Sequence, residues 1–404
     1  MSSYGVFNWV GDFLVLRDLL QLRQVSKTMK FDISLVRMLY ISSDISTDAI
    51  LFALSLFKNI RVFMLQNGSN LSNHSLSDIA RRGAEKMEIH SFGKASSNAE
   101  GLLGPYCPHH HVCHLRQLRI MRAVCTGPFL LNALAPLVGL KILYLERIHL
   151  LSDSDFHLIV EHCSSLEELS VRKCMLLHPV AFVPNFGCQL QSLSITECPS
   201  LRSVIFSPKC SRLTQLYLSN TSITQETAEH AMNTLPLSTL DVSHCSLVTC
   251  LKADSGTIRE INLRACFHLS RLEVSCCSLA HVDILLCKQL SMLLLQSSMI
   301  THIDLTMLTS LRLVTLQCSE LQTLDLSGCI QLNSVKTCGS CITLSRLGLV
   351  EDRTKQIHSH ADMLFSLSNL LPLLRCSSSS VGLFPRLPIS RDSISKLHPR
   401  SASL

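Results

Sequence analysis

A short pattern, Leu-x-x-Leu-x-Leu-x-x-Cys, recurs along the chain and restricts its fold more than any other feature of the sequence. Its copies start at Leu166, Leu190, Leu237, Ile258 and Leu321, with isoleucine or valine at some of the apolar positions. A pattern that returns after roughly 20–50 residues is the signature of an array in which each unit packs only on its neighbours. The 404 residues are therefore predicted to form one elongated array and not two or three separate globular domains.

The Leu-x-Leu core of the pattern predicts a short strand that places two side chains on one face. The cysteine that follows predicts a buried position, because a thiol packs like a small apolar group. Of the 19 cysteines, seven fall at this position: Cys174, Cys198, Cys245, Cys266, Cys277, Cys287 and Cys329. They are predicted to form an internal column of reduced thiols and not disulfide pairs, which favours the cytoplasm or the nucleus as the location of the protein.

The repeats resemble leucine-rich repeats, in particular the cysteine-containing kind of F-box proteins. This resemblance implies an α/β repeat, a leucine-rich-repeat solenoid, which we place at residues 46–350. Residues 93–114 interrupt the periodicity and are predicted to be a loop insertion.

The spacing of the strand centres predicts two kinds of coil. In the N-terminal half the centres Leu118, Leu143 and Leu169 lie 25 and 26 residues apart. The intervening segment 153–163 has apolar residues on one helical face and a helix-start signal at Ser152. A second helix is predicted at 225–233, so these coils are predicted to combine one strand with one helix.

From residue 240 to about 340 the spacing is halved. The centres are Leu240, Leu251, Ile261, Leu272, Val282, Leu293, Ile303, Val314, Leu324 and Val335, and their separations alternate between 11 and 10 residues. No helix fits between centres this close, so each 21-residue coil is predicted to contain two strands, one on the concave and one on the outer face. The alternative is a 21-residue coil whose outer segment is irregular.

Residues 1–45 are predicted to form a short helical segment. The stretch Arg17-Asp-Leu-Leu-Gln-Leu-Arg-Gln-Val-Ser-Lys resembles the later part of an F-box, although the usual opening Leu-Pro is absent and Met29 replaces a tryptophan. The resemblance implies binding of a Skp-type adaptor, and through it a cullin, by Phe7, Leu14, Leu19, Leu20 and Val25. The alternative is an apolar cap that covers the first coil, which every repeat array needs.

The C-terminal residues lose the repeat. Residues 351–375 are predicted to form a closing helix, because Met363, Leu364, Leu367, Leu370 and Leu371 share one helical face. Residues 376–404 are rich in serine, proline and arginine and are predicted to be disordered.

The sequence offers little chemistry for catalysis. The cluster 107–114 holds two cysteines and several histidines, but the gap between the cysteines is longer than zinc sites use, so a surface loop is the alternative. Nucleotide-binding and nucleophile-elbow motifs are absent from the sequence. A charge of +6 without a dense basic stripe argues against nucleic acid, and no apolar run reaches about 20 residues. We therefore predict no enzyme activity, no cofactor, no metal site and no membrane or nucleic-acid partner.

The residue between the two central apolar positions of each repeat is predicted to point away from the core, onto the concave face. In the C-terminal half these residues form an acidic column, which predicts that a basic segment of a partner protein binds there. The predicted substrate-binding residues are Tyr144, Tyr217, Asp241, Asn262, His281, Asp283, His302, Asp304 and Asp325. The alternative is an ordinary solvated repeat surface.

The resemblance to F-box and leucine-rich-repeat proteins implies the substrate-recognition subunit of a cullin-type (SCF) ubiquitin ligase. In this interpretation the N-terminal helices bind the Skp-type adaptor and the concave face holds the substrate protein. The alternative function is a non-enzymatic scaffold for protein interactions that has no role in a ligase.

Overall fold

The computed structural model describes residues 37–41, 47–56, 59–69, 71, 79–80, 83–92, 114–124, 127–135, 137–178, 180–182, 189–206, 210–338, 343–345 and 357–358. Its helices are α4 (Thr47–Leu56), α6 (Gly127–Leu134), α7 (Asp153–His162) and α8 (Gln225–Thr234). Its strands are β1 (Met38–Ile41), β2 (Val62–Leu65), β3 (Lys86–His90), β4 (Gln117–Met121), β5 (Ile142–Glu146), β6 (Glu168–Arg172), β7 (Val180–Phe182), β8 (Ser192–Thr196), β9 (Val204–Phe206), β10 (Gln215–Tyr217), β11 (Thr239–Asp241), β12 (Cys250–Asp254), β13 (Glu260–Asn262), β14 (Arg271–Ser275), β15 (His281–Asp283), β16 (Met292–Ser297), β17 (His302–Asp304), β18 (Leu313–Cys318), β19 (Thr323–Asp325), β20 (Ser334–Cys338), β21 (Thr343–Ser345) and β22 (Ile357–His358).

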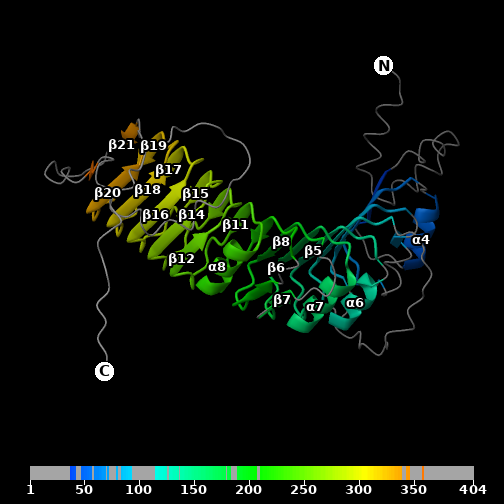
Figure 1. Cartoon of the computed structure of the whole chain (residues 1–404). Helices are drawn as coiled ribbons and strands as arrows, with labels where there is room; N and C mark the ends of the chain where they lie inside the picture. The colour runs from blue at the N-terminus through cyan, green and yellow to red at the C-terminus, as the bar shows by residue number, and fades with distance from the viewer. Residues whose placement is uncertain are drawn as a thin grey trace, which may run out of the picture. The chain divides into compact units, whose positions relative to one another are not determined.

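One long parallel sheet lines one side of the solenoid (Figure 1). It has 11 strands in the order β1-β2-β3-β4-β5-β6-β8-β10-β11-β13-β15, and β17-β19-β21 form a further parallel sheet with the same repeat. We call the outward-facing residues of these strands the concave face, as in the prediction. Leu118, Leu143 and Leu169 are partners in adjacent strands, so the predicted strand centres and the solenoid fold are confirmed.

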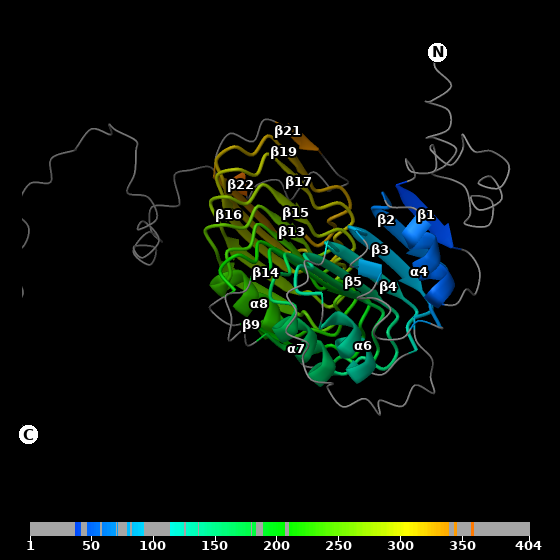
Figure 2. The same cartoon turned by 90° about the vertical axis from the view of Figure 1, so that its right-hand side faces the viewer.

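In the N-terminal half the other side of the solenoid carries helices. Figures 1 and 2 show α6 and α7 on the side opposite β5 and β6. The predicted start of α7 is confirmed, because Ser152 is its N-cap and forms a capping box with Asp155. The predicted helix at 225–233 is confirmed as α8.

Two coils of this half depart from the predicted strand-plus-helix pattern. Their outer segments are the short strands β7 and β9, which pair in parallel with each other. The sequence explains the difference, because prolines at 179, 184, 199 and 208 flank these segments. A proline inside a helix costs about 3 kcal/mol, whereas Val, Ile and Phe at the strand positions favour extended backbone.

In the C-terminal half every coil has two strands, as predicted. The outer sheet has the order β12-β14-β16-β18-β20-β22 and runs along the side opposite β13 and β15 (Figure 2). Leu251, Leu272, Leu293 and Val314 are successive partners in this sheet, which matches the predicted centres. The irregular outer segment considered as an alternative is therefore wrong for these coils.

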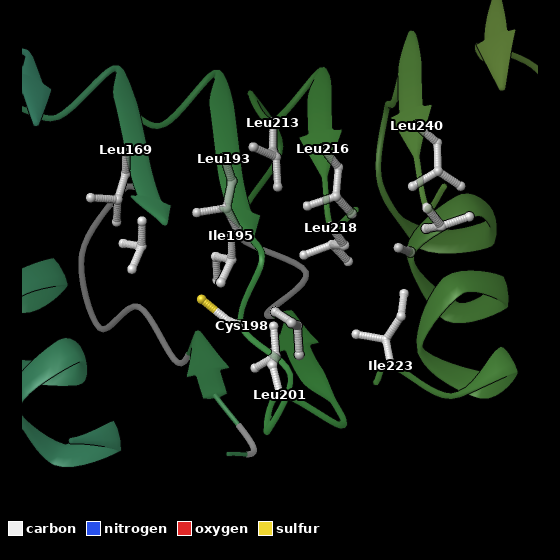
Figure 3. Packing of buried hydrophobic residues seen from close by; sticks show 14 of the residues in the cluster. Leu169, Leu193, Ile195, Cys198, Leu201, Leu213, Leu216, Leu218, Ile223 and Leu240 are labelled. Atoms are coloured by element: carbon white, nitrogen blue, oxygen red, sulfur yellow. The ribbon is translucent and has the colours of Figure 1, made fainter. Parts of the chain in front are cut away.

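The core is a thin apolar layer that runs through all the described coils. Figure 3 shows Leu169, Leu193, Leu216 and Leu240 in a row, one from each adjacent coil, and all four are fully buried. Burial alternates along the strands, since Leu293 and Leu295 of β16 are buried while Leu294 is only half-buried. This alternation is what the period of two in a strand requires.

The cysteine column is confirmed for six of its seven predicted members. Cys245, Cys266, Cys287 and Cys329 each donate a thiol hydrogen bond to a carbonyl of the preceding coil, with S···O distances of 3.1–3.2 Å. Cys174 and Cys198 are equally buried. The seventh assignment is wrong: Cys277 follows the outer strand β14 and not a concave strand, and it is exposed, whereas Cys276 before it is buried and donates to the Ile258 carbonyl.

Thiol labelling of the native protein should therefore modify Cys277 quickly and leave Cys266 and Cys287 unmodified. Burial raises the pKa of Cys287 to about 11 and that of Cys266 further, so neither reacts as a thiolate near neutral pH. Mass spectrometry after a short alkylation measures this, and the denatured protein, in which all three should react, is the control. Equal labelling of the three thiols in the native state would contradict the burial of the column.

The concave sheet is interrupted at one place, between β15 and β17. The outer sheet continues past this point, since β16 pairs with both β14 and β18. At the corresponding coil the cysteine position holds Leu308, whereas Cys287 and Cys329 occupy it in the coils on either side. The interruption thus coincides with the coil that lacks the thiol hydrogen bond.

The structure also changes the predicted boundaries. β1 lies within the range 1–45 predicted as helical but pairs with β2, so the solenoid begins before residue 46. Ile357 and His358 form β22 and pair with β20, so the chain is extended inside the predicted closing helix, because the edge of β20 offers unpaired backbone groups. Residues 1–36, most of the insertion 93–114, and the remainder of the predicted closing helix and tail lie outside the described residues.

Candidate protein-binding face

The register of the strands places the predicted concave residues other than His281 and His302 at the same position of their strands. Tyr144 lies opposite Ser170, and Tyr217 is the partner of Asp241. Asp241, Asn262 and Asp283 are then successive partners, and Asp304 is the partner of Asp325 in the further sheet. We call Asp241, Asp283, Asp304 and Asp325, which are partly or fully exposed, the acidic column.

Each residue of the acidic column also ends its own strand. Asp241, Asp283, Asp304 and Asp325 accept a hydrogen bond at Oδ1 from the backbone N–H two residues later, at 2.8–3.0 Å. Asn262 accepts the same bond, from Arg264, at 3.0 Å. These are Asx turns, in which a short polar side chain replaces a backbone acceptor. The turn fixes the direction of each carboxylate and uses one of its two oxygens.

Few positive side chains neutralise the acidic column among the described residues. Arg264 approaches Asp283, with 3.9 Å between Nη1 and Oδ2. His281 and His302 lie beside the column and are exposed, and His302 Nδ1 lies 2.6 Å from the Thr323 hydroxyl. Hydrogen bonds from Ser327 lower the pKa of Asp325, so its charge persists to lower pH than that of an ordinary carboxylate.

The N-terminal half of the concave face differs, because its charges pair with one another. The Tyr144 hydroxyl donates to Glu168 Oε1 at 2.6 Å, and the Arg119 guanidinium lies 6.0 Å from the centre of the Tyr144 ring. Arg119 also pairs with Glu146 at 3.8 Å. Burial, followed by the hydrogen bond to Glu168, raises the pKa of Tyr144 to about 12. Tyr144 thus belongs to a closed network, which leaves less of it for a partner.

Tyr217 lies where these two halves meet. Burial raises its pKa, and the negative charges of Glu260, Asp241 and Glu168 raise it further. The tyrosine hydroxyl therefore stays protonated and is a hydrogen-bond donor at the N-terminal end of the acidic column.

Several features of this face were missed in the sequence. Strands β1–β3 extend the concave face by Tyr40, Met64 and Glu88, and the 24-residue spacing of Leu39, Phe63 and Met87 was the signal for them. The Asx turns were missed as well, although Asn262 in the same column pointed to a role that needs no charge.

The remaining predicted sites are not tested by the structure. The adaptor-binding residues Phe7, Leu14, Leu19, Leu20 and Val25 and the cysteines of the 107–114 cluster lie outside the described residues. Within the described ranges no cluster of His, Cys, Asp or Glu could hold a metal ion. Over the same ranges no helix has the length and apolar character that a membrane crossing requires.

The parallel sheets and the sequence repeats together define the fold as a leucine-rich-repeat solenoid. Similar solved structures include the yeast complex of Rad7 and Elc1, at 16% identity and a TM-score of 0.38, covering 89% of this chain and 93% of that chain. An internalin, InlF from Listeria monocytogenes, is 16% identical with a TM-score of 0.34, covering 81% and 90%. The functional domain of InlJ from Listeria monocytogenes, which includes a cysteine ladder, is 14% identical with a TM-score of 0.29, covering 71% and 69%.

At TM-scores below 0.5 these likenesses support no conclusion about this chain. No protein-family model and no curated protein sequence matches the chain.

Proposed function

We propose that this solenoid is the substrate-recognition subunit of a cullin-type (SCF) ubiquitin ligase and that it holds a basic segment of its substrate along the acidic column. The observation that supports substrate binding is the set of carboxylates held by Asx turns at one position of successive coils. Asp304 and Asp325 lie on paired strands, about 4.8 Å apart, so their equal charges repel each other by roughly 1 kcal/mol in water. A basic segment relieves this repulsion.

The role in a ligase rests on the sequence resemblance of residues 17–27 to an F-box. In this proposal Phe7, Leu14, Leu19, Leu20 and Val25 contact a Skp-type adaptor, which in turn binds a cullin. The chain itself contributes no catalytic group and no cofactor, and it works in the cytoplasm or the nucleus.

Affinity purification of the full chain, probed for a Skp-type adaptor and a cullin, tests the role in a ligase. Wild-type protein should recover both, whereas Leu19→Asp and Leu20→Asp should each lose the adaptor, because a charge replaces an apolar contact. The control is Leu294→Asp on the half-buried face of β16, which should retain the adaptor. A wild-type chain that recovers no adaptor would contradict the proposal.

The second candidate function is a protein-interaction scaffold outside any ligase. The closed network around Arg119, Tyr144 and Glu168 and the open acidic column favour binding of one partner at the C-terminal half only. This function needs no adaptor, so substrate binding without adaptor recovery distinguishes it from the ligase role.

A further inference from the structure

Five consecutive coils each expose one large apolar side chain at the same edge of the solenoid, just after the concave strand. These residues are Leu247 (45% exposed), Phe267 (48%), Leu286 (46%), Met307 (67%) and Ile330 (67%), and we call them the edge stripe. Single exposed apolar residues are normal on a protein surface, whereas a continuous row marks an interaction site. The row borders the acidic column, because its members follow the column position of their own coil by three to six residues.

Two members of the edge stripe combine an apolar side chain exposed to water with an unfavourable backbone conformation. Leu286 and Met307 have φ values of +67° and +60°, in the left-handed region. The same turn position also has a positive φ in other described coils, where it holds polar, charged or small residues: Ser91, Arg122, Arg147, Lys173, Glu197, Asn220, His244, Ala265 and Gly328. Asparagine and glycine adopt this conformation more readily than leucine or methionine. The turn therefore does not require a large exposed apolar side chain at these two coils, and such a side chain does not favour solubility.

The stripe is continuous between neighbouring coils. A Cβ atom added to Gly328 would lie 2.6 Å from the Met307 sulfur, so the Met307 side chain lies over the turn of the next coil. Ile330 follows two residues later in that turn. The apolar surface thus extends along the solenoid axis and not only around one coil.

We infer that the edge stripe binds an amphipathic helix of a partner protein whose apolar residues face the stripe and whose basic residues face the acidic column. The spacing supports a helix, since its turn rises about 5.4 Å and the coils repeat about every 4.8 Å. An extended segment repeats its side chains on one face about every 6.6 Å, which fails to match successive coils. Over five coils the mismatch reaches about 2 Å for a helix and about 7 Å for a strand.

The charges beside the stripe favour a protein partner over a membrane. Asp283, Asp304 and Asp325 lie three to five residues before Leu286, Met307 and Ile330, respectively. Carboxylates at this distance repel the anionic headgroups of a lipid surface, whereas they attract lysine or arginine on the flank of a helix. Lys288 is exposed and follows Leu286 in the chain, whereas Asp283 precedes it. A lysine repels the basic flank of a helix, so we expect that flank to lie on the side of the acidic column.

A designed peptide of about 18 residues tests the inference, with leucines at i, i+3, i+4 and i+7 and lysines on one flank. Fluorescence anisotropy with the full chain measures its binding. The variant Leu286→Asn with Met307→Gly should bind the peptide at least tenfold more weakly while its thermal midpoint is unchanged or higher, because both new residues suit the turn. Met299→Ser is the control, since Met299 is 56% exposed outside the stripe, and this variant should bind normally.

The inference would be overturned by a double variant that binds the peptide as the wild type does, or by equal binding of a peptide with the same residues in period-two order. Two further results would also overturn it: binding to phosphatidylcholine vesicles, or a wild-type dimer, if the double variant abolishes either. The inference shares the acidic column with the proposed function. The stripe variants keep every aspartate of the acidic column. A failure of the helix-binding inference is therefore distinguishable from a failure of the proposed function.

Discussion

Replacement of Asp283, Asp304 and Asp325 together by asparagine should weaken the binding of a basic substrate segment by between about threefold and a hundredfold. Each exposed charge pair contributes roughly 0.2–1 kcal/mol, and 1.4 kcal/mol is about a factor of ten in affinity. The fold should be unaffected, because asparagine keeps the side-chain oxygen that accepts the Asx-turn hydrogen bond. Asn262 shows that this residue forms the same turn in the same column, at 3.0 Å.

The chain offers a matched control in the opposite direction. Asn262→Asp adds a fifth negative charge to the acidic column, between Asp241 and Asp283, without changing the turn, and it should strengthen binding. A lysine at any of these positions would be a poorer test, because it removes the acceptor for the backbone N–H as well as the charge. Normal binding by the triple variant would mean that the column is solvated repeat surface and that recognition lies elsewhere, for example at Tyr217.

Salt should separate this effect from a structural one. The Debye length falls from about 10 Å at 0.1 M salt to about 3 Å at 1 M, so the wild-type protein should lose affinity as salt rises. The triple asparagine variant should respond less, because it has fewer charges to screen. Titration calorimetry at two salt concentrations measures both responses.

The sequence alone predicted the positions of the strands because side-chain burial has a strict period in this fold. Leu240 to Val335 alternate by 11 and 10 residues, and each of these ten residues lies in a described strand. The same reasoning failed at β7 and β9, where the coil length matches that of the helical coils and only the prolines distinguish the two. It failed again at Cys277, because this residue follows an outer strand, where Cys276 before it is the buried residue.

The candidate face was predicted in position but not in its energetics. The pattern places Asp283 and Asp304 on the concave face, and burial and register confirm this placement. It does not indicate that each carboxylate is already held by a backbone N–H, because the turn depends on backbone torsion angles that a repeat pattern does not specify. It also does not indicate the edge stripe, since Leu286 and Met307 read as ordinary apolar residues until their exposure is known.

The largest expected effect on stability comes from the outer sheet, which distinguishes this solenoid from a coil with irregular outer segments. Leu293→Ala should lower the free energy of unfolding by about 2–5 kcal/mol, because Leu293 is fully buried between the two sheets and its loss leaves a cavity. Each coil packs only on its neighbours, so the variant should also broaden or split the unfolding transition. Denaturant titration followed by circular dichroism measures both effects.

Leu294 provides the control, since it is the same residue type one position along the same strand but is only half-buried. Leu294→Ala should cost less than Leu293→Ala, because the Leu294 side chain is partly in contact with water and its loss leaves no enclosed cavity. In an irregular outer segment the two positions would have no fixed side, and the two substitutions would cost the same. A clear difference between adjacent leucines therefore tests the alternation on which both the register of the outer sheet and the orientation of the opposite concave face depend.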